Sequence, residues 1–222
     1  DCSWAEEEIL MNYVVLLMFA FGEGAVSFGA VRRWLLEVMD QFPRNAVVFN
    51  LFVQTEERYG LSHRVRSYWQ RAWEGDNNKE TLGAVRGGAK LGATPSLVMI
   101  MVRFELRREC VPRALGVLER ALTKGETRHC AVLWRVLMDV HVHSGKADAA
   151  KRVYFRAISL CAWSKSIWLH ALRVPEVRSL MSDQELSDVV DTMGSKGLRV
   201  RAMLEEVLPV DVLASLKTSR PS

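Results

Sequence analysis

The sequence predicts an all-α fold in which helix pairs stack into an α-α superhelix. Apolar residues recur at steps of three and four along nearly the whole chain, which is the spacing of a helix face. The 222 residues include only six prolines, and alternating β-branched patterns are scarce, which disfavours a sheet. Glycines and prolines divide the chain into segments of about 12 to 18 residues, a common helix length in bundles and solenoids.

Residues 1–43 are predicted to form an N-terminal helix pair in which repeat markers are poorly preserved, with Ala30 and Trp34 as the plausible ones. The most apolar run, Ile9–Phe21, holds thirteen residues including Asn12. It is well short of the roughly 20 residues that a bilayer span needs. We therefore expect this run to be a buried helix.

An internal repeat becomes visible when three later segments are aligned. The dipeptide Arg-Ala recurs at Arg71-Ala72, Arg120-Ala121 and Arg156-Ala157. A second marker lies fifteen residues before each arginine and is occupied by Glu56, Glu105 and His141. Four residues after that marker come Gly60, Glu109 and Gly145. The units follow each other at 49 and then 36 residues, and the extra thirteen fall in a glycine-rich insertion at about 75–94.

Helix geometry explains why such markers repeat. In the second helix of each unit a bulky residue precedes a small alanine, as Tyr154 precedes Ala157, which lets two helices approach to about 8–10 Å. In the first helix, residues three apart, such as Trp134 and Leu137, share one apolar stripe. One helix pair cannot bury these faces alone, so neighbouring pairs must stack. The sequence therefore predicts helical repeats over residues 44–173.

Residues 174–222 are predicted to close the array with capping helices and a frayed tail. Ser182 and Glu185 have the S-x-x-E spacing of a capping box, and we expect them to serve that purpose alone. The segment 198–208 is amphipathic enough to seal the end of the repeats. From about residue 215 the chain is expected to fray.

The third unit resembles the half-a-tetratricopeptide (HAT) repeat, a TPR-like helix pair whose first helix carries W-x-x-Y-x-x-x-E. The matching positions are Trp134, Gly145, Ala150, Lys151, Val153, Tyr154, Arg156 and Ala157. Leu137 stands where an aromatic residue is usual, and His141 where the family has an acid. The first-helix acid and the second-helix arginine are structural in that family, so His141 affects a stabilising pair. The predicted structural markers are Glu56, Arg71, Ala72, Glu105, Arg120, Ala121, Trp134, Arg156, Ala157 and Trp168.

Two further segments resemble the C-terminal part of the nuclear RNAi-defective-two family. They are ISLCAWSKSIWLHALR at 158–173 and SKGLRVRAMLEEV at 195–207, with Ala162 in place of the family's proline. This resemblance implies a nuclear scaffold in RNA-mediated gene silencing, in association with the nuclear exosome's RNA helicase, or in splicing. It implies no cofactor, and HAT repeats also allow homodimerisation.

Charge is segregated along the chain, although the net charge is only +4. Residues 1–60 carry four basic and nine acidic groups, whereas residues 103–173 carry fourteen basic and six acidic groups. The candidate binding patch in the basic zone consists of Arg103, Arg107, Arg108, Arg113, Arg128, Arg135, Lys151 and Arg152. Such a zone can bind phosphates, bind an acidic peptide, or be a merely solvated helix surface.

Seven tryptophans provide a second set of interaction candidates. We assign Trp34, Trp69, Trp134 and Trp168 to packing between helices, because they lie at marker positions. Trp73 and Trp163 are less constrained, and an exposed one could stack on an RNA base.

The residues expected of an enzyme or a metal site are missing from the sequence. His141 and His143 point about 200° apart on a helix, unlike a zinc-binding i, i+4 pair. The four cysteines, Cys2, Cys110, Cys130 and Cys161, form no CxxC pair, which favours a reducing compartment and disfavours zinc. The glycine-rich insertion lacks the GxxxxGK phosphate-loop pattern. We therefore predict no catalytic residues and no metal.

The function predicted from these observations is a non-catalytic nuclear scaffold that binds a protein partner, most simply a helix or an extended peptide from an RNA-processing, exosome or splicing factor. Apolar contacts would provide affinity, and the basic zone would select acidic flanks. The alternative is a module that binds RNA directly through residues 103–173.

Overall fold

The computed structural model describes residues 3–71, 93–123 and 125–198, which form helices joined by turns, without a β-strand in these ranges. The predicted all-α class of consecutive helix pairs is therefore confirmed. The chain forms two compact units, unit 1 (residues 1–104) and unit 2 (residues 105–222). Helix α5 (Pro95–Arg107) begins in unit 1, and its last three residues belong to unit 2.

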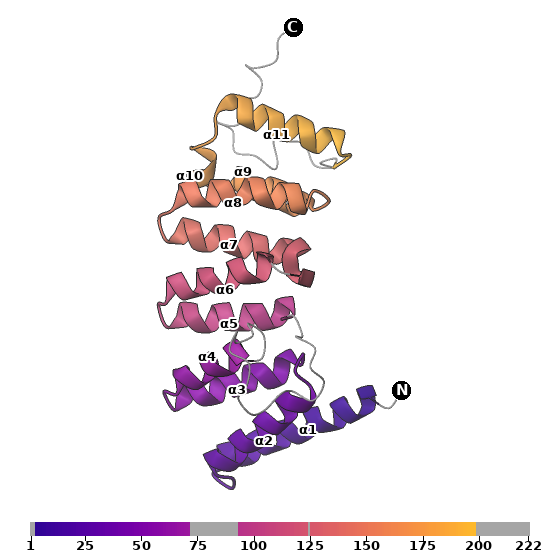
Figure 1. The fold of residues 1–222 in the computed structure, drawn as a ribbon, viewed down its shortest axis with the longest axis vertical. Helices are drawn as coiled ribbons and strands as arrows, with labels where there is room; N and C mark the ends of the chain where they lie inside the picture. Colours follow the sequence, from indigo (N-terminus) through magenta and orange to yellow (C-terminus); the bar gives the residue numbers. More distant parts are fainter. Residues whose placement is uncertain (1–2, 72–92, 124, 199–222) are drawn as a thin grey trace. The chain divides into compact units, whose positions relative to one another are not determined.

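Unit 1 contains α1 (Ser3–Gly22), α2 (Phe28–Gln41), α3 (Ala46–Arg58), α4 (Ser62–Trp69) and most of α5. Consecutive helices pack on each other, α1 on α2, α2 on α3 and α3 on α4 (Figure 1). Polar residues in the turns start two of these helices. The Ser27 hydroxyl accepts from the amide of Ala30, and the Asn45 side-chain oxygen accepts from the amides that follow it.

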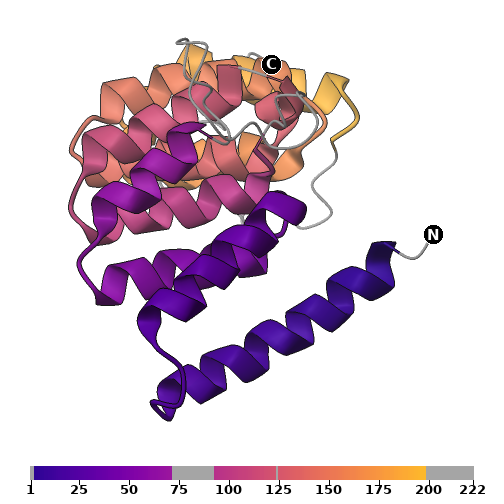
Figure 2. The ribbon, with the colours of Figure 1, turned by 60° about the horizontal axis from the view of Figure 1, so that its bottom comes forward.

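Helix α1 forms where the apolar run predicts a helix, but the expectation that it is buried was wrong. Ile9, Val15, Leu16 and Phe19 are each 61–69% exposed. Val14 alone is fully buried among the described side chains of this helix. A helix that is apolar on all sides needs partners on several sides, and α1 contacts α2 along one side (Figure 2).

Unit 2 contains α6 (Val111–Thr123), the 3₁₀ turn η2 (Gly125–His129), α7 (Ala131–His143), α8 (Ala147–Leu160), α9 (Lys165–Arg173), α10 (Pro175–Arg178) and α11 (Asp183–Ser195). Near the beginnings of α7 and α9, two tryptophans make equivalent hydrogen bonds to the turn before the helix. The indole N–H of Trp134 donates to the Arg128 carbonyl at 2.8 Å, and that of Trp168 donates to the Ala162 carbonyl at 3.0 Å. Both rings are buried, so each satisfies its polar atom on the turn six residues earlier.

Within the described residues, one type of turn follows five of the helices. Its left-handed residue has a φ between 57° and 76° and is Gly24, Gly60, Glu109, Gly145 or Gly197. In each turn the next amide donates to the carbonyl five residues before it, at 2.9–3.1 Å. Gly24 precedes Gly60 by 36 residues, the same interval that separates Glu109 from Gly145. The α1–α2 pair therefore has the turn geometry of the later repeats, although it lacks their side-chain markers.

The predicted capping box of α11 is confirmed. The Ser182 hydroxyl accepts from the Glu185 amide at 3.2 Å, and the Glu185 carboxylate accepts from the Ser182 amide at 2.8 Å. The expectation that this pair does nothing else was wrong. Glu185 also binds the Lys151 ammonium of α8 at 2.8 Å, so the box ties α11 to the preceding helix.

Several predicted features lie outside the described residues. They are Cys2, Ala72, Trp73, most of the glycine-rich insertion, the 199–208 part of the capping segment and the tail. The predicted boundaries at residues 43 and 173 stay predictions.

Candidate functional site

An apolar groove lies in unit 2 where the end of α5 and the start of α6 meet the last two turns of α7. Its volume is about 390 Å³. It is lined by Leu106, Val111, Val136, Asp139, Val140, His143 and Ser144. Leu106 of this lining is itself exposed, and so is Val132, one turn before Val136 on α7.

The spacing of residues on α7 explains the groove. Val132, Val136 and Val140 follow each other at steps of four and lie along one side of the helix, while Trp134 and Met138 are buried on the opposite side. The left-handed turns at Glu109 and Gly145 end α5 and α7 at the same edge of the unit. The groove is thus a product of the repeat geometry combined with small apolar side chains.

The acid in the groove lining is already paired. The Asp139 carboxylate lies 2.7 Å from His170 Nε2 of α9. His143 Nδ1 lies 2.7 Å from the Asp139 carbonyl, one turn earlier on the same helix. Arg107 and Arg108 follow Leu106 in the chain, and Arg135 precedes Val136, and all three are exposed. The groove therefore combines an apolar floor with a basic border, which suits an apolar segment that carries acidic residues.

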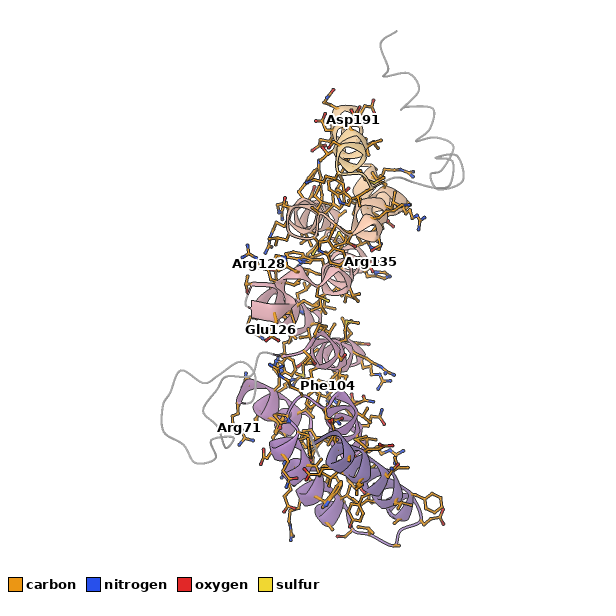
Figure 3. All side chains as sticks on the ribbon, turned by 90° about the vertical axis from the view of Figure 1, so that its right-hand side faces the viewer. Arg71, Phe104, Glu126, Arg128, Arg135 and Asp191 are labelled. Atoms are coloured by element: carbon orange, nitrogen blue, oxygen red, sulfur yellow. The ribbon has the colours of Figure 1, made fainter. Side chains whose placement is uncertain are left out.

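The predicted basic patch is not a single surface in unit 2. Arg128 and Arg135 lie on opposite sides of this unit (Figure 3). Arg128 lines a second hollow, together with Leu122, Thr123, Phe155, Arg156, Ser159 and Leu160. Lys151 is engaged structurally, because its ammonium donates to both the Leu180 carbonyl and Glu185 at 2.8 Å.

The remaining predicted patch residues are distributed as follows. Arg113 and Arg152 are exposed in unit 2 on α6 and α8. Arg103 is exposed on the part of α5 that belongs to unit 1. In unit 2, Arg107, Arg108 and Arg135 are thus exposed chain neighbours of residues that line the groove, while Arg128 lines the second hollow.

The markers Ala157, Trp134 and Trp168 are buried, and Ala121 is half-buried. Arg156 lies over the Trp134 ring at 5.2 Å and contacts the Glu119 carboxylate at 3.4 Å. Glu105 is buried, and Arg71 and Arg120 are exposed.

In unit 1 the first-helix acid forms an ion pair with another helix. Glu56 is fully buried and pairs with Arg32 of α2 at 2.8 Å, whereas Arg71, which follows the end of α4, donates to the Ser67 carbonyl of that helix. Burial raises the pKa of Glu56, and the Arg32 charge opposes that shift only in part. At the equivalent position in unit 2, burial lowers the pKa of the half-buried His141.

The unassigned tryptophan Trp163 is 66% exposed in the turn between α8 and α9. Trp69 is buried against Phe49, and Trp34 meets the Tyr13 ring edge-on at 4.8 Å. Of the two tryptophans left open by the sequence, the one in the described range is thus available to a ligand.

The described residues contain no cluster of three or more His, Cys, Asp or Glu side chains that could hold a metal ion. Within the same ranges, no helix has both the length and the apolar character needed to cross a membrane.

These features define a helical-repeat protein with an apolar groove on one helix face. The predicted resemblance to the nuclear RNAi-defective-two family is confirmed by three similar proteins that are named nuclear exosome regulators. Its similarity extends to a mouse (Mus musculus) protein named nuclear exosome regulator NRDE2, with 24% identity over 217 residues, covering 90% of this chain and 17% of that protein. The proteins of the same name from Homo sapiens and Dictyostelium discoideum are 23% and 21% identical over 92% and 80% of this chain.

The chain spans less than a fifth of these curated relatives, namely 17%, 18% and 13% of their lengths. No protein-family model matches it. Among solved structures, a crystal structure of MamA protein is similar, with a TM-score of 0.44, 15% identity, and coverage of 89% of this chain and 98% of that one. A second MamA structure has a TM-score of 0.42 and covers 81% and 95%.

Proposed function

We propose that this chain is a non-catalytic, nuclear helical-repeat scaffold whose groove in unit 2 binds a protein partner in exosome-linked RNA decay. Splicing and RNA-mediated gene silencing are the neighbouring processes in which the same scaffold would act. The apolar groove with its basic border is the observation that carries this proposal. The names of the relatives, nuclear exosome regulators, supply the process.

The chemistry of the groove specifies the ligand. Leu106, Val136 and Val140 offer apolar contacts, and such contacts provide affinity when an amphipathic helix or an extended peptide enters a groove. The Asp139 carboxylate in this lining already has a hydrogen-bond partner, the His170 ring. Arg107, Arg108 and Arg135 would then select a segment with Asp or Glu beside its apolar anchors.

A pull-down from nuclear extract, with and without ribonuclease and read by mass spectrometry, tests the proposal. Wild-type chain should retain RNA-decay proteins after ribonuclease, and Val136→Glu should lose them because it places a charge in the groove. Val47→Glu, at an exposed valine of α3, is the matched control and should behave as wild type. Loss of every specific partner after ribonuclease would contradict protein binding, and retention by Val136→Glu would place the site elsewhere.

Direct RNA binding is the second candidate, favoured by the exposed ring of Trp163 and by Arg128 in the second hollow. An RNA base can stack on such a ring while the guanidinium contacts phosphate. The double variant Trp163→Ala, Arg128→Glu should then lose binding of a labelled oligouridine and flatten its salt dependence, whereas Arg135→Glu should not. Equal binding by all three proteins would reject this site.

A further inference from the structure

Helix α1 presents an apolar surface to solvent that the proposed function does not use. This α1 face consists of Ile9, Tyr13, Val15, Leu16 and Phe19. On most protein surfaces, exposed apolar residues are scattered singly. A contiguous apolar face is therefore typical of an interaction site.

Helical spacing makes these residues one contiguous surface. Ile9, Leu16 and Phe19 are separated by seven and three residues, so their side chains lie on the same side of the helix, while Val14 points into the unit. Tyr13 forms the border, since its ring packs on Trp34 of α2 at 4.8 Å. From Ile9 to Phe19 the surface extends about 15 Å along the helix axis.

Acidic residues frame both ends of the α1 face. Glu6 and Glu8 precede it and Glu23 follows it, and all three are exposed. Glu7, by contrast, accepts a hydrogen bond from the Asn45 side chain at 2.6 Å and so helps to hold α1 in the unit. Residues 1–31 contain five acids and no Lys, Arg or His. The field around this surface is therefore negative.

The charges decide between the occupants of such a surface. A second copy of this chain would bring Glu6 and Glu8 against either Glu23 or their own counterparts, so both orientations juxtapose like charges. A partner helix with basic ends would instead bring opposite charges together in both orientations. The framing acids are about 15–17 residues apart, which corresponds to roughly 22–26 Å along a helix.

We propose that the α1 face docks an amphipathic helix of a partner protein, with an apolar stripe of about three turns and Lys or Arg at both ends of that stripe. The stripe covers Ile9, Leu16 and Phe19, and the basic ends pair with Glu6, Glu8 and Glu23. This partner differs in charge from the acidic ligand proposed for the groove in unit 2.

A synthetic helix of about 18 residues tests the proposal. The probe carries leucines at helical spacing, two lysines at each end and a fluorescein label, and its binding to the 222-residue chain is followed by fluorescence anisotropy. Leu16→Glu should weaken binding by about tenfold or more, because the glutamate would be buried without a partner. Val132→Glu, at an exposed valine of α7, and the groove variant Val136→Glu should bind the probe like wild type, which separates this surface from the proposed function.

The second part of the experiment exchanges the charges of the probe and of the acidic residues around the α1 face. The two probes are compared on the groove variant Val136→Glu, because the groove of unit 2 is itself proposed to bind an apolar segment with acidic residues. On this variant a probe with glutamates in place of the lysines should bind at least about tenfold more weakly than the lysine probe. It should recover affinity when Glu6→Lys, Glu8→Lys and Glu23→Lys are added to Val136→Glu. Circular dichroism checks that each variant keeps its helices. Equal binding of both probes, an unaffected Leu16→Glu variant, or a dimer in sedimentation velocity that Leu16→Glu dissociates would overturn the proposal.

Discussion

Helices α1 and α7 show how the same local design leads to different surroundings. Both end in a left-handed glycine turn, at Gly24 and Gly145, and both are rich in apolar residues. In α7 the large side chains, with Trp134 at their centre, face inward, whereas α1 directs Leu16 and Phe19 to solvent. The backbone turn therefore sets where a helix ends, and the neighbouring helices decide which of its residues are buried.

The largest expected difference follows from this comparison. Trp134→Ala should lower the free energy of unfolding by about 3–5 kcal/mol, because the ring is fully buried and its indole N–H bonds the Arg128 carbonyl. Leu16→Ala should change it by less than about 0.5 kcal/mol, since its side chain is mostly exposed. Urea unfolding followed by circular dichroism measures both. A loss of several kcal/mol for Leu16→Ala would show that the α1 face is covered in the isolated chain.

The ion pair inside unit 1 should have the next largest effect. Arg32→Ala leaves the buried Glu56 carboxylate without its arginine and should cost about 3 kcal/mol at pH 7. Arg33→Ala, at the exposed neighbouring position, should be nearly neutral.

The pH dependence sharpens this prediction. The native pKa of Glu56 is raised above its ordinary 4.5, so the native state binds its proton more tightly than the unfolded state does. Protonation of Glu56 therefore stabilises the native state. This contribution to the free energy of unfolding is fully present below about pH 4.5 and is lost as pH rises through the native pKa. The cost of Arg32→Ala should therefore shrink from pH 7 to pH 5 in urea titrations. A cost that is independent of pH would assign the effect to lost packing.

Substitutions in the left-handed turns should have smaller effects on stability, in opposite directions at Glu109 and Gly145. Glu109 holds a left-handed conformation that Gly60 and Gly145 adopt without strain. Glu109→Gly should stabilise the chain by about 1 kcal/mol, and Gly145→Ala should destabilise it by about the same amount, because open space surrounds Gly145 and only its φ resists a side chain. Thermal unfolding should show a higher melting temperature for Glu109→Gly and a lower one for Gly145→Ala than for wild type. A destabilised Glu109→Gly variant would mean that this glutamate makes a contact worth more than the backbone strain.

Features with a short-range physical cause could be predicted from the sequence. The helix periodicity, the offsets of the Arg-Ala units and the Ser182–Glu185 capping box each depend on residues within a few turns of one another, and the helices and the box are confirmed. The repeat turn of the α1–α2 pair was missed because the interpretation relied on side-chain markers. The interval of 36 residues between Gly24 and Gly60 would have revealed it.

Features that depend on distant residues could not be predicted in this way. The exposure of α1 depends on what packs against it, and an apolar run alone cannot distinguish a covered face from an uncovered one. The partner of Glu56 proved to be Arg32 on another helix. The groove arises where Leu106 and Val136 meet from different helices, and a count of basic residues cannot place Arg128 and Arg135 on opposite sides.

The smallest effect is expected at the other carboxylate, Glu185, where the sign of the pH dependence is opposite to that of Glu56. A hydrogen bond from Lys151 and one from the Ser182 amide lower the pKa of Glu185 below its ordinary 4.5. Its contribution is therefore present above about pH 4.5 and is lost as pH falls through the native pKa. Lys151→Met should cost less than about 1 kcal/mol at pH 7, because the pair is partly solvated. That cost should decrease in urea titrations as the pH falls below 4.5 and through the native pKa, and Arg152→Met should show no such pH dependence. If the cost of Lys151→Met persists in acid, the bond from Lys151 to the Leu180 carbonyl, and not the pair with Glu185, ties α8 to the chain before α11.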